Sequence, residues 1–351
     1  MKKNILQIGP SITRSKGGMA TVLDGIKNNK LLNLNHNINF HDSYIDGNII
    51  KRLIFSVIAY IKFKTIYSKY DIFHIHMASY GSVFRKGYYI KFLNKKNKKI
   101  ILHVHGGAYL KFYEGLSENK KRKVREIWDK CDCVIALSEV WKRNFENIFN
   151  HKNIVIVNNG IDIKQYEEGK SIDKKDNFLF LGKIVKAKGV YDLVSAIEQI
   201  IEKYPNILVY MAGEGETNQL EQIINKKNLN NNIKLVGWID FETKLKLLKD
   251  VSTVILPSYN EGLPMALLEG MASGKVVIGT NVGGIPELIE EGINGFVIEP
   301  GDINELSKSI IKIIDDNELV EKISQNNIKK IKKEFSGKKM YETIDKLYNE
   351  Y

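Results

Sequence analysis

Short apolar runs alternate with longer amphipathic stretches along almost the whole chain. This alternation predicts a parallel sheet covered by helices, rather than an all-helical or an all-strand fold. In the first half, the predicted strands are Ile5–Ile8, Ile72–His76, Ile100–His105, Cys133–Leu137 and Ile154–Val157. In the second half they are Phe178–Leu181, Leu208–Ala212, Lys234–Val236, Thr253–Leu256 and Val276–Gly279. Ligands of such sheets bind beyond the carboxyl ends of the strands, so we expect the chemistry at the residues that follow these runs.

A charged stretch at residues 164–177 separates the two series of strands. Each series opens with an apolar run that leads into glycine, ILQIG at residues 5–9 and FLFLG at residues 178–182. We therefore predict the same α/β architecture used twice, in domains of residues 1–168 and 169–334. Residues 335–351 are amphipathic and are predicted to form a C-terminal helix. A chain of 351 residues, 43% of them apolar, is long enough for about two domains with ordinary cores.

The positive charge is concentrated in one half of the chain. The sequence has 53 Lys and Arg against 41 Asp and Glu, a net charge of +12. Residues 1–170 hold 30 bases and 14 acids, a net of +16, and the remainder holds 23 bases and 27 acids, a net of −4. Within residues 51–99, twelve bases stand against one acid, Asp71. Such a local field attracts anions, which leaves nucleic acid, anionic membrane and phosphorylated ligands as partner classes.

The two cysteines, Cys131 and Cys133, lie two apart in an apolar run, so a strand would place them on one face where they do not pair easily. They indicate a reduced, cytoplasmic chain, and no further zinc ligands stand at short spacing beside them. The first residues, MKKNILQIGPS, have too short an apolar run for a signal peptide. Leu53–Ile61 also falls well short of the roughly 20 apolar residues that cross a bilayer.

The passage at residues 257–284, PSYNEGLPMALLEGMASGKVVIGTNVGG, carries the clearest candidate site. Glu261 and Glu269 flank the predicted start of a helix, where Pro264 suits the first helical position. The free amides of that first turn and the helix dipole favour an anion such as phosphate. The two carboxylates could accept hydrogen bonds from hydroxyls beside it, which is the chemistry of a sugar nucleotide. The alternative is that Glu269 decorates the helix and Glu261 an exposed loop, but this leaves the glycines and proline around them unexplained.

A second candidate cluster is LGKIVKAKGV at residues 181–190, directly after the strand that opens the second domain. Its Gly182, Lys183, Lys188 and Gly189 stand at the end of that strand. Two lysines five apart can hold a diphosphate as separate point charges. The alternative is a solvated lysine-rich loop.

In the first domain, the sequence GGMATV from Gly17 is predicted to form the loop into the first helix, where backbone without side chains can approach a ligand. The alternative is a tight turn. His103 and His105 share a face at the end of a strand, in the sequence HVHGG. His105 is the candidate to hydrogen-bond a sugar hydroxyl or to stabilise charge, while His103, His74 and His76 are predicted to be structural.

The most basic region is also apolar: KRLIFSVIAYIKFK from Lys51 and RKGYYIKFLNKKNKK from Arg85. A helix with apolar residues on one face and lysines at its borders can lie in an anionic membrane interface. The candidate membrane contacts are Lys51, Arg52, Phe55, Lys62 and Lys64. A core helix with lysines on its solvent side is the alternative. Nucleic acid is not expected, because no recognised binding module accompanies the charge.

Taken together, these motifs resemble glycosyltransferase family four, the retaining glycosyltransferases of the GT-B fold. The match extends over most of the chain and is most detailed in the second domain. Besides the passages above, it includes ALSE around Ser138, NNGID from Asn158, AGEGE from Ala212, VGW at Val236 and NGFVIEPGD from Asn294. The resemblance implies two Rossmann-like domains facing a central cleft, the first binding the acceptor and the second the nucleotide sugar, with the C-terminal helix crossing back to the first domain.

The family's roles can be carried onto matching residues. Glu261 would contact the donor sugar, Glu269 would hold the ribose hydroxyls, and Lys188 would bind the diphosphate. Lys183 stands where the family usually has arginine, so a bidentate contact would be lost there. His105 would meet the donor sugar and stabilise the reacting centre. The residues implied to bind the nucleotide or donor are Gly17, Gly18, Gly182, Lys183, Lys188, Gly213, Glu261, Gly262, Leu263, Pro264 and Glu269.

The resemblance further implies transfer of a hexose or N-acetylhexosamine with retention, without a metal or another cofactor. The donor would be a UDP-sugar or otherwise a GDP-sugar, and the acceptor a lipid-linked or surface-polysaccharide precursor at the inner face of the cell membrane. No D-x-D, the metal-binding motif of the other common glycosyltransferase fold, occurs in the chain. Two alternatives remain: a non-catalytic subunit that binds a sugar nucleotide, and a sugar-nucleotide epimerase of related fold.

Overall fold

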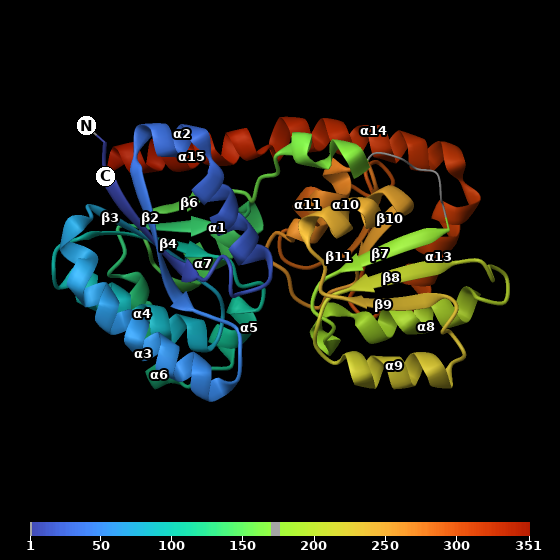
Figure 1. Ribbon diagram of the computed structural model, residues 1–351, viewed down its shortest axis with the longest axis horizontal. Coiled ribbons are helices and arrows are strands. Elements are labelled where there is room, and N and C mark those ends of the chain that lie inside the picture. The colour runs from blue at the N-terminus through green and yellow to red at the C-terminus, as the bar shows by residue number, and fades with distance from the viewer. Residues whose placement is uncertain (1, 170–175) are drawn as a thin grey trace. The chain divides into compact units, whose positions relative to one another are not determined.

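The computed structural model describes residues 2–169 and 176–351, and the chain divides into two compact units (Figure 1). The first unit comprises Met1–Asn159 together with Lys338–Tyr351, and the second comprises Gly160–Gly337. Each unit is built on a six-stranded sheet in which every described pair of neighbouring strands is parallel. The predicted α/β fold with two parallel sheets is therefore confirmed.

The first sheet has the strand order β2-β1-β3-β4-β5-β6. Its strands are β1 (Asn4–Pro10), β2 (Asn37–Tyr44), β3 (Ile72–Met77), β4 (Lys99–Val104), β5 (Cys133–Ala136) and β6 (Ile154–Ile156). β3 and β5 are buried along their whole length, as strands of a parallel sheet are when helices cover both faces. The carboxyl ends of β1, β3 and β4 are neighbours in this order, so residues that follow these strands lie along one edge.

The second sheet has the strand order β12-β11-β10-β7-β8-β9. Its strands are β7 (Asn177–Leu181), β8 (Leu208–Ala212), β9 (Ile233–Gly237), β10 (Thr253–Leu256), β11 (Val276–Thr280) and β12 (Phe296–Ile298). The loop after β7 carries the lysine cluster and the loop after β10 carries Glu261. Because β7 and β10 are neighbours, the sheet brings these two loops together.

Helices connect the strands in both units. In the first unit they are α1 (Gly18–Asn28), α2 (Lys30–Asn35), α3 (Ile49–Ile66), η1 (Tyr67–Lys69), α4 (Gly81–Asn94), α5 (Tyr109–Glu114), α6 (Glu118–Trp128) and α7 (Glu139–Ile148). In the second they are η2 (Ile163–Gly169), η3 (Lys186–Lys188), α8 (Val190–Ile200), α9 (Thr217–Lys226), α10 (Phe241–Asp250), α11 (Met265–Ala272), α12 (Ile285–Leu288), α13 (Ile303–Asp315) and α14 (Asn317–Glu334). Several begin at a capping side chain that accepts a backbone N–H, such as Ser138 before α7 and Asp240 before α10.

The last helix, α15 (Gly337–Glu350), packs on the first unit, so the chain returns to the unit in which it began (Figure 1). Its Tyr348 is fully buried and accepts a hydrogen bond from the Gln7 side chain of β1 at 2.6 Å. Its Asp345 lies 3.0 Å from His36 Nε2 and accepts a hydrogen bond from Asn35 at 2.9 Å. These polar contacts hold the helix against β1 of the sheet and against the end of α2.

The structure differs from the sequence prediction at two strands and at the unit boundaries. β2 and β12 were not predicted, because β2 is an edge strand with few apolar residues and β12 is only 3 residues long. The first unit ends at Asn159 instead of residue 168, since Ile161 bonds through its backbone to Phe335 and Gly337 of the second unit. Of the charged stretch at residues 164–177, residues 170–175 lie outside the described residues.

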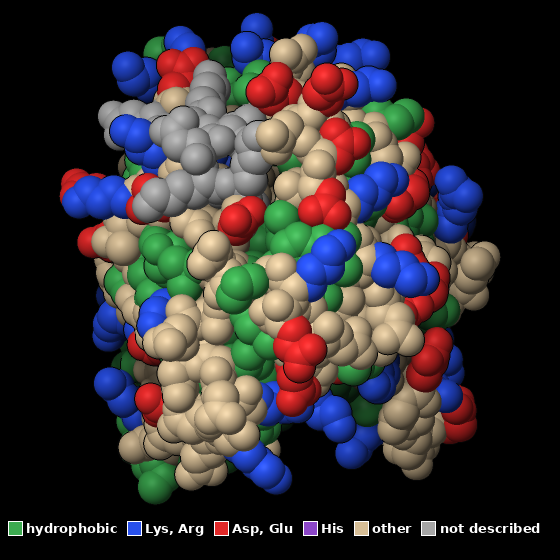
Figure 2. Space-filling view, turned by 90° about the vertical axis from the view of Figure 1, so that its right-hand side faces the viewer, with side chains coloured by type: hydrophobic (Ala, Val, Ile, Leu, Met, Phe, Trp, Pro, Cys, Tyr) green, Lys and Arg blue, Asp and Glu red, His purple; other side chains and the backbone are tan. Residues whose placement is uncertain are grey.

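The surface of the second unit carries charges of both signs. Figure 2 shows basic and acidic side chains interspersed on the side of the molecule that it presents, rather than gathered into one field. This agrees with the small net charge of −4 for residues 171–351, from 23 bases and 27 acids. Among the described residues, no helix is both long and apolar enough to cross a membrane.

Candidate active site

The loop between β10 and α11 places Glu261 at the carboxyl edge of the second sheet. Glu261 is buried, with 8% of its surface exposed. Gly283 packs against this loop with φ of 57°, and a Cβ there would lie 1.9 Å from the Glu261 carbonyl oxygen. The Gly284 amide donates to the Gly262 carbonyl at 2.7 Å. These glycines at the end of the passage therefore hold the backbone around Glu261, and only glycine fits at position 283.

The helix start beside Glu261 differs slightly from the prediction. α11 begins at Met265, and Pro264 is the residue that precedes it, with an extended backbone at ψ of 123°. Pro264 is thus the cap and not the first helical residue. Leu263 and Gly262 are buried beside it. The first-turn amides of α11 still follow the Glu261 loop directly, as the prediction required.

Lys188 and Glu261 form an ion pair within the second unit. Lys188 Nζ lies 2.5 Å from Glu261 Oε1, and the Ser258 hydroxyl donates to the same oxygen at 2.8 Å. Gly189 makes this approach possible: its φ is 69°, and a Cβ there would lie 2.0 Å from the Pro257 carbonyl oxygen. The structure therefore joins the lysine cluster to the glutamate passage and places a cation beside a carboxylate.

The glycines after β7 and β8 lie against each other. A Cβ on Gly213 would lie 1.7 Å from the Gly182 carbonyl oxygen, so these two backbone segments could not approach so closely with a larger residue at position 213. Lys183 follows Gly182 and is exposed. The carboxyl edge of the second sheet therefore presents glycine backbone and the Lys183 side chain. Lys188 lies in the loop at this same edge.

Glu269 lies inside α11 and has two partners that the sequence did not suggest. Its Oε1 accepts hydrogen bonds from Lys244 of α10 at 2.7 Å and from Tyr166 of η2 at 3.1 Å. Glu269 is 5% exposed. Burial and the Glu269 charge raise the pKa of the Tyr166 hydroxyl, which keeps it a hydrogen-bond donor. No spacing signal could have found Lys244 or Tyr166, since each lies far from Glu269 in the sequence.

In the first unit, Gly17 is the residue that precedes α1. Its φ of 114° requires glycine, and a Cβ built on it would meet no atom within 4 Å. Gly18 opens the helix and is exposed. The predicted loop into the first helix is therefore present, with open space beside its backbone.

His105 follows the last residue of β4 and is partly exposed. Its backbone amide donates to the Met77 carbonyl at 2.8 Å, and its Nε2 lies 2.9 Å from His76 Nδ1. Gly106 is required next to it, because a Cβ there would lie 2.7 Å from the Ser79 amide nitrogen. These contacts hold the His105 ring at the edge of the first sheet.

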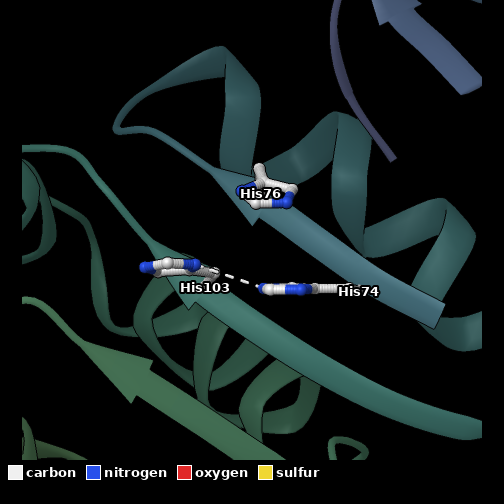
Figure 3. A group of neighbouring side chains, drawn as sticks. All are labelled: His74, His76 and His103. Atoms are coloured by element: carbon white, nitrogen blue, oxygen red, sulfur yellow. Dashed lines mark hydrogen bonds between the residues drawn. The ribbon is translucent and has the colours of Figure 1, made fainter. Parts of the chain in front are cut away.

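His105 belongs to a layered array of four imidazoles on β3 and β4, the histidine array. His74 and His103 form one hydrogen-bonded pair, at 3.2 Å, and His76 and His105 form the other. Between the pairs, the His74 and His76 rings are stacked with centroids 4.4 Å apart, and the His103 and His105 rings are tilted by 32° with centroids 4.0 Å apart. Figure 3 shows the His74 and His103 rings side by side and the His76 ring above them.

The histidines of this array are neutral at pH 7. Burial lowers the pKa of His74 and of His105 to about 3. Burial, followed by the charges of neighbouring histidines, holds the pKa values of His76 and His103 well below the ordinary value. A neutral imidazole has one N–H and one bare nitrogen, so each ring both donates and accepts.

Three of these side chains lie close enough to be considered as metal ligands. Nitrogens of His74, His76 and His103 fall within 4.8 Å of one another. A nitrogen lone pair lies in its ring plane, and the planes are inclined to each other by 13° for His74 and His103, 23° for His74 and His76 and 35° for His76 and His103. His74 Nε2 and His103 Nδ1 lie 3.2 Å apart and share a hydrogen bond, so these two nitrogens face each other. The arrangement of these histidine nitrogens therefore suits a hydrogen-bond network.

The candidate membrane helix, α3, is apolar on two opposite faces. Its inner face packs on the first unit through Ala59 and Phe63, while seven apolar side chains on the outer face are each 56–66% exposed. These outer residues are Ile49, Ile50, Leu53, Ile54, Val57, Ile58 and Ile61. Lys51, Lys62 and Lys64 are exposed beside them.

Two of the five predicted membrane contacts point the other way. Arg52 is only partly exposed, and its guanidinium donates to the Tyr44 hydroxyl at 3.5 Å. Phe55 is also partly buried, with the Arg14 guanidinium 4.9 Å from its ring centroid. Both stand on the inner half of the helix, because Phe55 lies four residues and Arg52 seven residues before the buried Ala59, spacings of about one and two helical turns that share its face.

Comparison with known proteins places this chain in a family. A family described as "Glycosyl transferases group 1" matches residues 162–330, and one described as "Glycosyltransferase Family 4" matches residues 29–165. A relative described as an uncharacterized glycosyltransferase of Methanocaldococcus jannaschii is 30% identical over 279 residues, covering 75% of this chain and 71% of its own. The chain belongs to glycosyltransferase family 4. The resemblance drawn from its motifs is thereby confirmed.

This chain is also similar to a protein of surface-glycan biosynthesis and to a solved structure of the GT-B fold. The capsular polysaccharide biosynthesis glycosyltransferase CapM of Staphylococcus aureus is 26% identical over 238 residues, covering 62% of this chain and 61% of its own. A crystal structure of the Anabaena protein HepE, in complex with UDP-glucose, has a TM-score of 0.78 at 19% identity, covering 99% of this chain and 100% of its own. The family thus includes relatives in surface-glycan biosynthesis, and the fold is that of the GT-B enzymes.

Proposed function

We propose that this protein is a retaining glycosyltransferase that moves a hexose or N-acetylhexosamine from a nucleotide sugar to a lipid-linked or surface-polysaccharide precursor. The observation that carries the proposal is the contact of Lys188 with Glu261 at the start of α11. This contact unites a cation suited to a diphosphate, a carboxylate suited to sugar hydroxyls and the free amides of a helix. CapM acts in capsule biosynthesis and HepE was crystallised with UDP-glucose, which supports a surface-glycan acceptor and a UDP-sugar donor.

In the proposed reaction, the bond between the sugar and the diphosphate breaks as the acceptor hydroxyl attacks from the same face. The leaving phosphate oxygen receives the hydroxyl proton, so the products are the glycosylated acceptor and the nucleoside diphosphate. Lys188, Lys183 and the α11 amides would stabilise the negative charge that gathers on the diphosphate. Glu261 would contact the sugar as it becomes oxocarbenium-like. Such a site needs no metal ion, because cationic side chains and amides supply the positive charge.

Glu269 would hold the ribose of the nucleotide. Its Oε1 is already occupied by Lys244 and Tyr166, so the ribose hydroxyls would bind at Oε2. In this arrangement the hydrogen bonds from Lys244 and Tyr166 restrict rotation of the Glu269 carboxylate. Lys244 is 17% exposed in its side chain, so the pair is shielded from solvent.

The donor class is tested by thermal shift with UDP, GDP and their sugars. A ligand at about 100 times its Kd stabilises a protein by about 2.7 kcal/mol. We expect UDP and at least one UDP-sugar to raise the melting temperature. If they do not, we expect GDP and a GDP-sugar to raise it instead. If no uridine or guanosine diphosphate compound shifts the melting curve, the proposed donor site is wrong.

We also propose that the protein works at the inner face of the cell membrane, with the outer face of α3 in the lipid interface. Seven exposed apolar side chains on one helix would insert among lipid chains, and the adjacent Lys51, Lys62 and Lys64 would meet anionic headgroups. The +16 net charge of residues 1–170 favours the same anionic surface. Because Arg52 and Phe55 face inward, they are left out of this surface.

Charge reversal at Lys51 and Lys62 should weaken binding to anionic vesicles. Each lysine near such a surface contributes about 1 kcal/mol, so removing one costs about fivefold in affinity. The matched control reverses two exposed lysines of the second unit, Lys332 and Lys333, and should bind as the unaltered protein does. Vesicle sedimentation reports both. Equal binding to neutral and anionic vesicles would overturn the membrane proposal.

A further inference from the structure

A buried hydrogen-bond network joins His105 to the C-terminal helix. Gln7 of β1 lies at its centre: its Nε2 donates to the Tyr348 hydroxyl at 2.6 Å, and its Oε1 lies 2.8 Å from His76 Nε2. His76 Nδ1 then contacts His105 Nε2. Tyr348 contacts His74 Nδ1 at 2.7 Å. Gln7 is 1% exposed and Tyr348, His74 and His76 are fully buried, so water does not substitute for these partners.

The Gln7 amide gives this network a direction. Its Oε1 can only accept, so His76 must carry its hydrogen on Nε2. Because His76 is neutral, its Nδ1 is then bare and accepts a hydrogen from His105 Nε2. His105 is neutral as well, so its hydrogen is on Nε2 and its Nδ1 is a bare acceptor. One amide on β1 thus determines the tautomer of the histidine that directly follows β4.

Tyr348 links the Gln7 amide to the other histidine pair. Its hydroxyl accepts from Gln7 Nε2 and donates to His74 Nδ1, and His74 in turn donates from Nε2 to His103 Nδ1. Turning the amide over would reverse the direction of every one of these bonds. The His105 ring also packs against the His103 ring, with centroids 4.0 Å apart, which restricts its rotation.

We propose that Gln7, Tyr348 and His76 are positioning residues that fix His105 in the tautomer protonated at Nε2, so that Nδ1 accepts a hydrogen bond from a hydroxyl of the donor sugar. This inference rests on the proposed function for the identity of the ligand, but its statement about the tautomer stands alone. It also gives α15 a role in the reaction beyond packing. The packing of the C-terminal helix would set the hydrogen-bonding character of a residue on the first sheet.

The test compares Gln7→Met and Tyr348→Phe with the unaltered full chain. Nitrogen NMR of histidine side chains distinguishes the two neutral tautomers directly. We expect His105 to be protonated at Nε2 in the unaltered protein and to become a mixture of tautomers in both variants. The kcat of sugar transfer should fall about tenfold in each variant, because one oriented hydrogen bond to the sugar is lost. The change in KM should be smaller.

Tyr351→Phe is the matched control. Tyr351 also anchors the end of the chain, since its hydroxyl donates to the Asp132 carbonyl at 3.2 Å and accepts from Asn153, but it does not touch the network. Its variant should keep both the tautomer and the activity. An unchanged His105 tautomer in Gln7→Met and Tyr348→Phe, or an Nδ1-protonated His105 in the unaltered protein, would overturn the proposal. Failure of the unaltered protein to bind UDP would instead count against the proposed function, and the NMR result would still stand.

Discussion

Replacing Glu261 with glutamine should lower sugar transfer by about 100-fold or more, while the protein stays folded and still binds UDP. Glutamine has nearly the same volume, and its carbonyl can still accept from Ser258 and Lys188, which both bond to Glu261 Oε1. The substitution removes the negative charge beside the donor sugar, where the proposed mechanism develops positive charge. Initial rates with a labelled UDP-sugar measure the effect, and UDP-dependent melting shows whether the nucleotide site remains.

Glu198→Gln is the matched control for this substitution. Glu198 also pairs with a lysine, Lys227, but it lies on α8 with 44% of its side chain exposed. Its loss should leave the rate unchanged, because surface ion pairs contribute little. A Glu261→Gln variant with full activity would remove the basis of the proposed site.

Acidification from pH 7 to pH 5 should destabilise the first unit by about 2 kcal/mol for each histidine that stays neutral in the fold. His74, His76 and His103 are at most 1% exposed, and burial lowers all three pKa values below the ordinary 6.5. Below pH 6.5 the unfolded chain binds protons at these histidines and the folded chain does not. The free energy of unfolding of this unit is therefore not reduced by these histidines above pH 6.5, and it falls as the pH is lowered below that value.

Urea unfolding at several pH values, followed by fluorescence of the buried Trp128 and Trp141 of this unit, measures that slope. A variant with glutamine at both His74 and His103 should show a shallower slope, whatever its absolute stability. If the unfolding free energy were constant from pH 7 to pH 5, the histidine array could not be neutral as described.

Most of the fold was predictable because parallel strands covered on both faces are short continuous apolar runs. β7 and β10 are examples, and their apolar segments locate them to within a residue or so. β2 escaped prediction since only three of its eight residues, Ile38, Phe40 and Tyr44, are apolar, so it does not form the continuous apolar run of a covered parallel strand. The return of α15 to the first unit depends on contacts such as Gln7 with Tyr348, which no local pattern contains.

The candidate site was predictable where chemistry follows strand ends and glycines. Lys188 and Glu261 lie 73 residues apart, yet each follows a strand of the same sheet, and the sheet order brings them into contact. Lys244 is different, because it occupies one position of an amphipathic helix with several lysines. The inward direction of Phe55 was also hidden, since α3 is apolar on two faces and composition does not say which one is packed.

The most direct test of the proposed function is incubation of the protein with labelled UDP-sugars, with and without a membrane extract that supplies the acceptor. We predict that label enters the lipid or polysaccharide fraction only when protein and extract are both present, with one UDP released for each sugar transferred. Label that remains in the nucleotide sugar under all conditions, or that appears as a different or free sugar without any acceptor, would contradict the proposal that this chain is a sugar transferase of this kind.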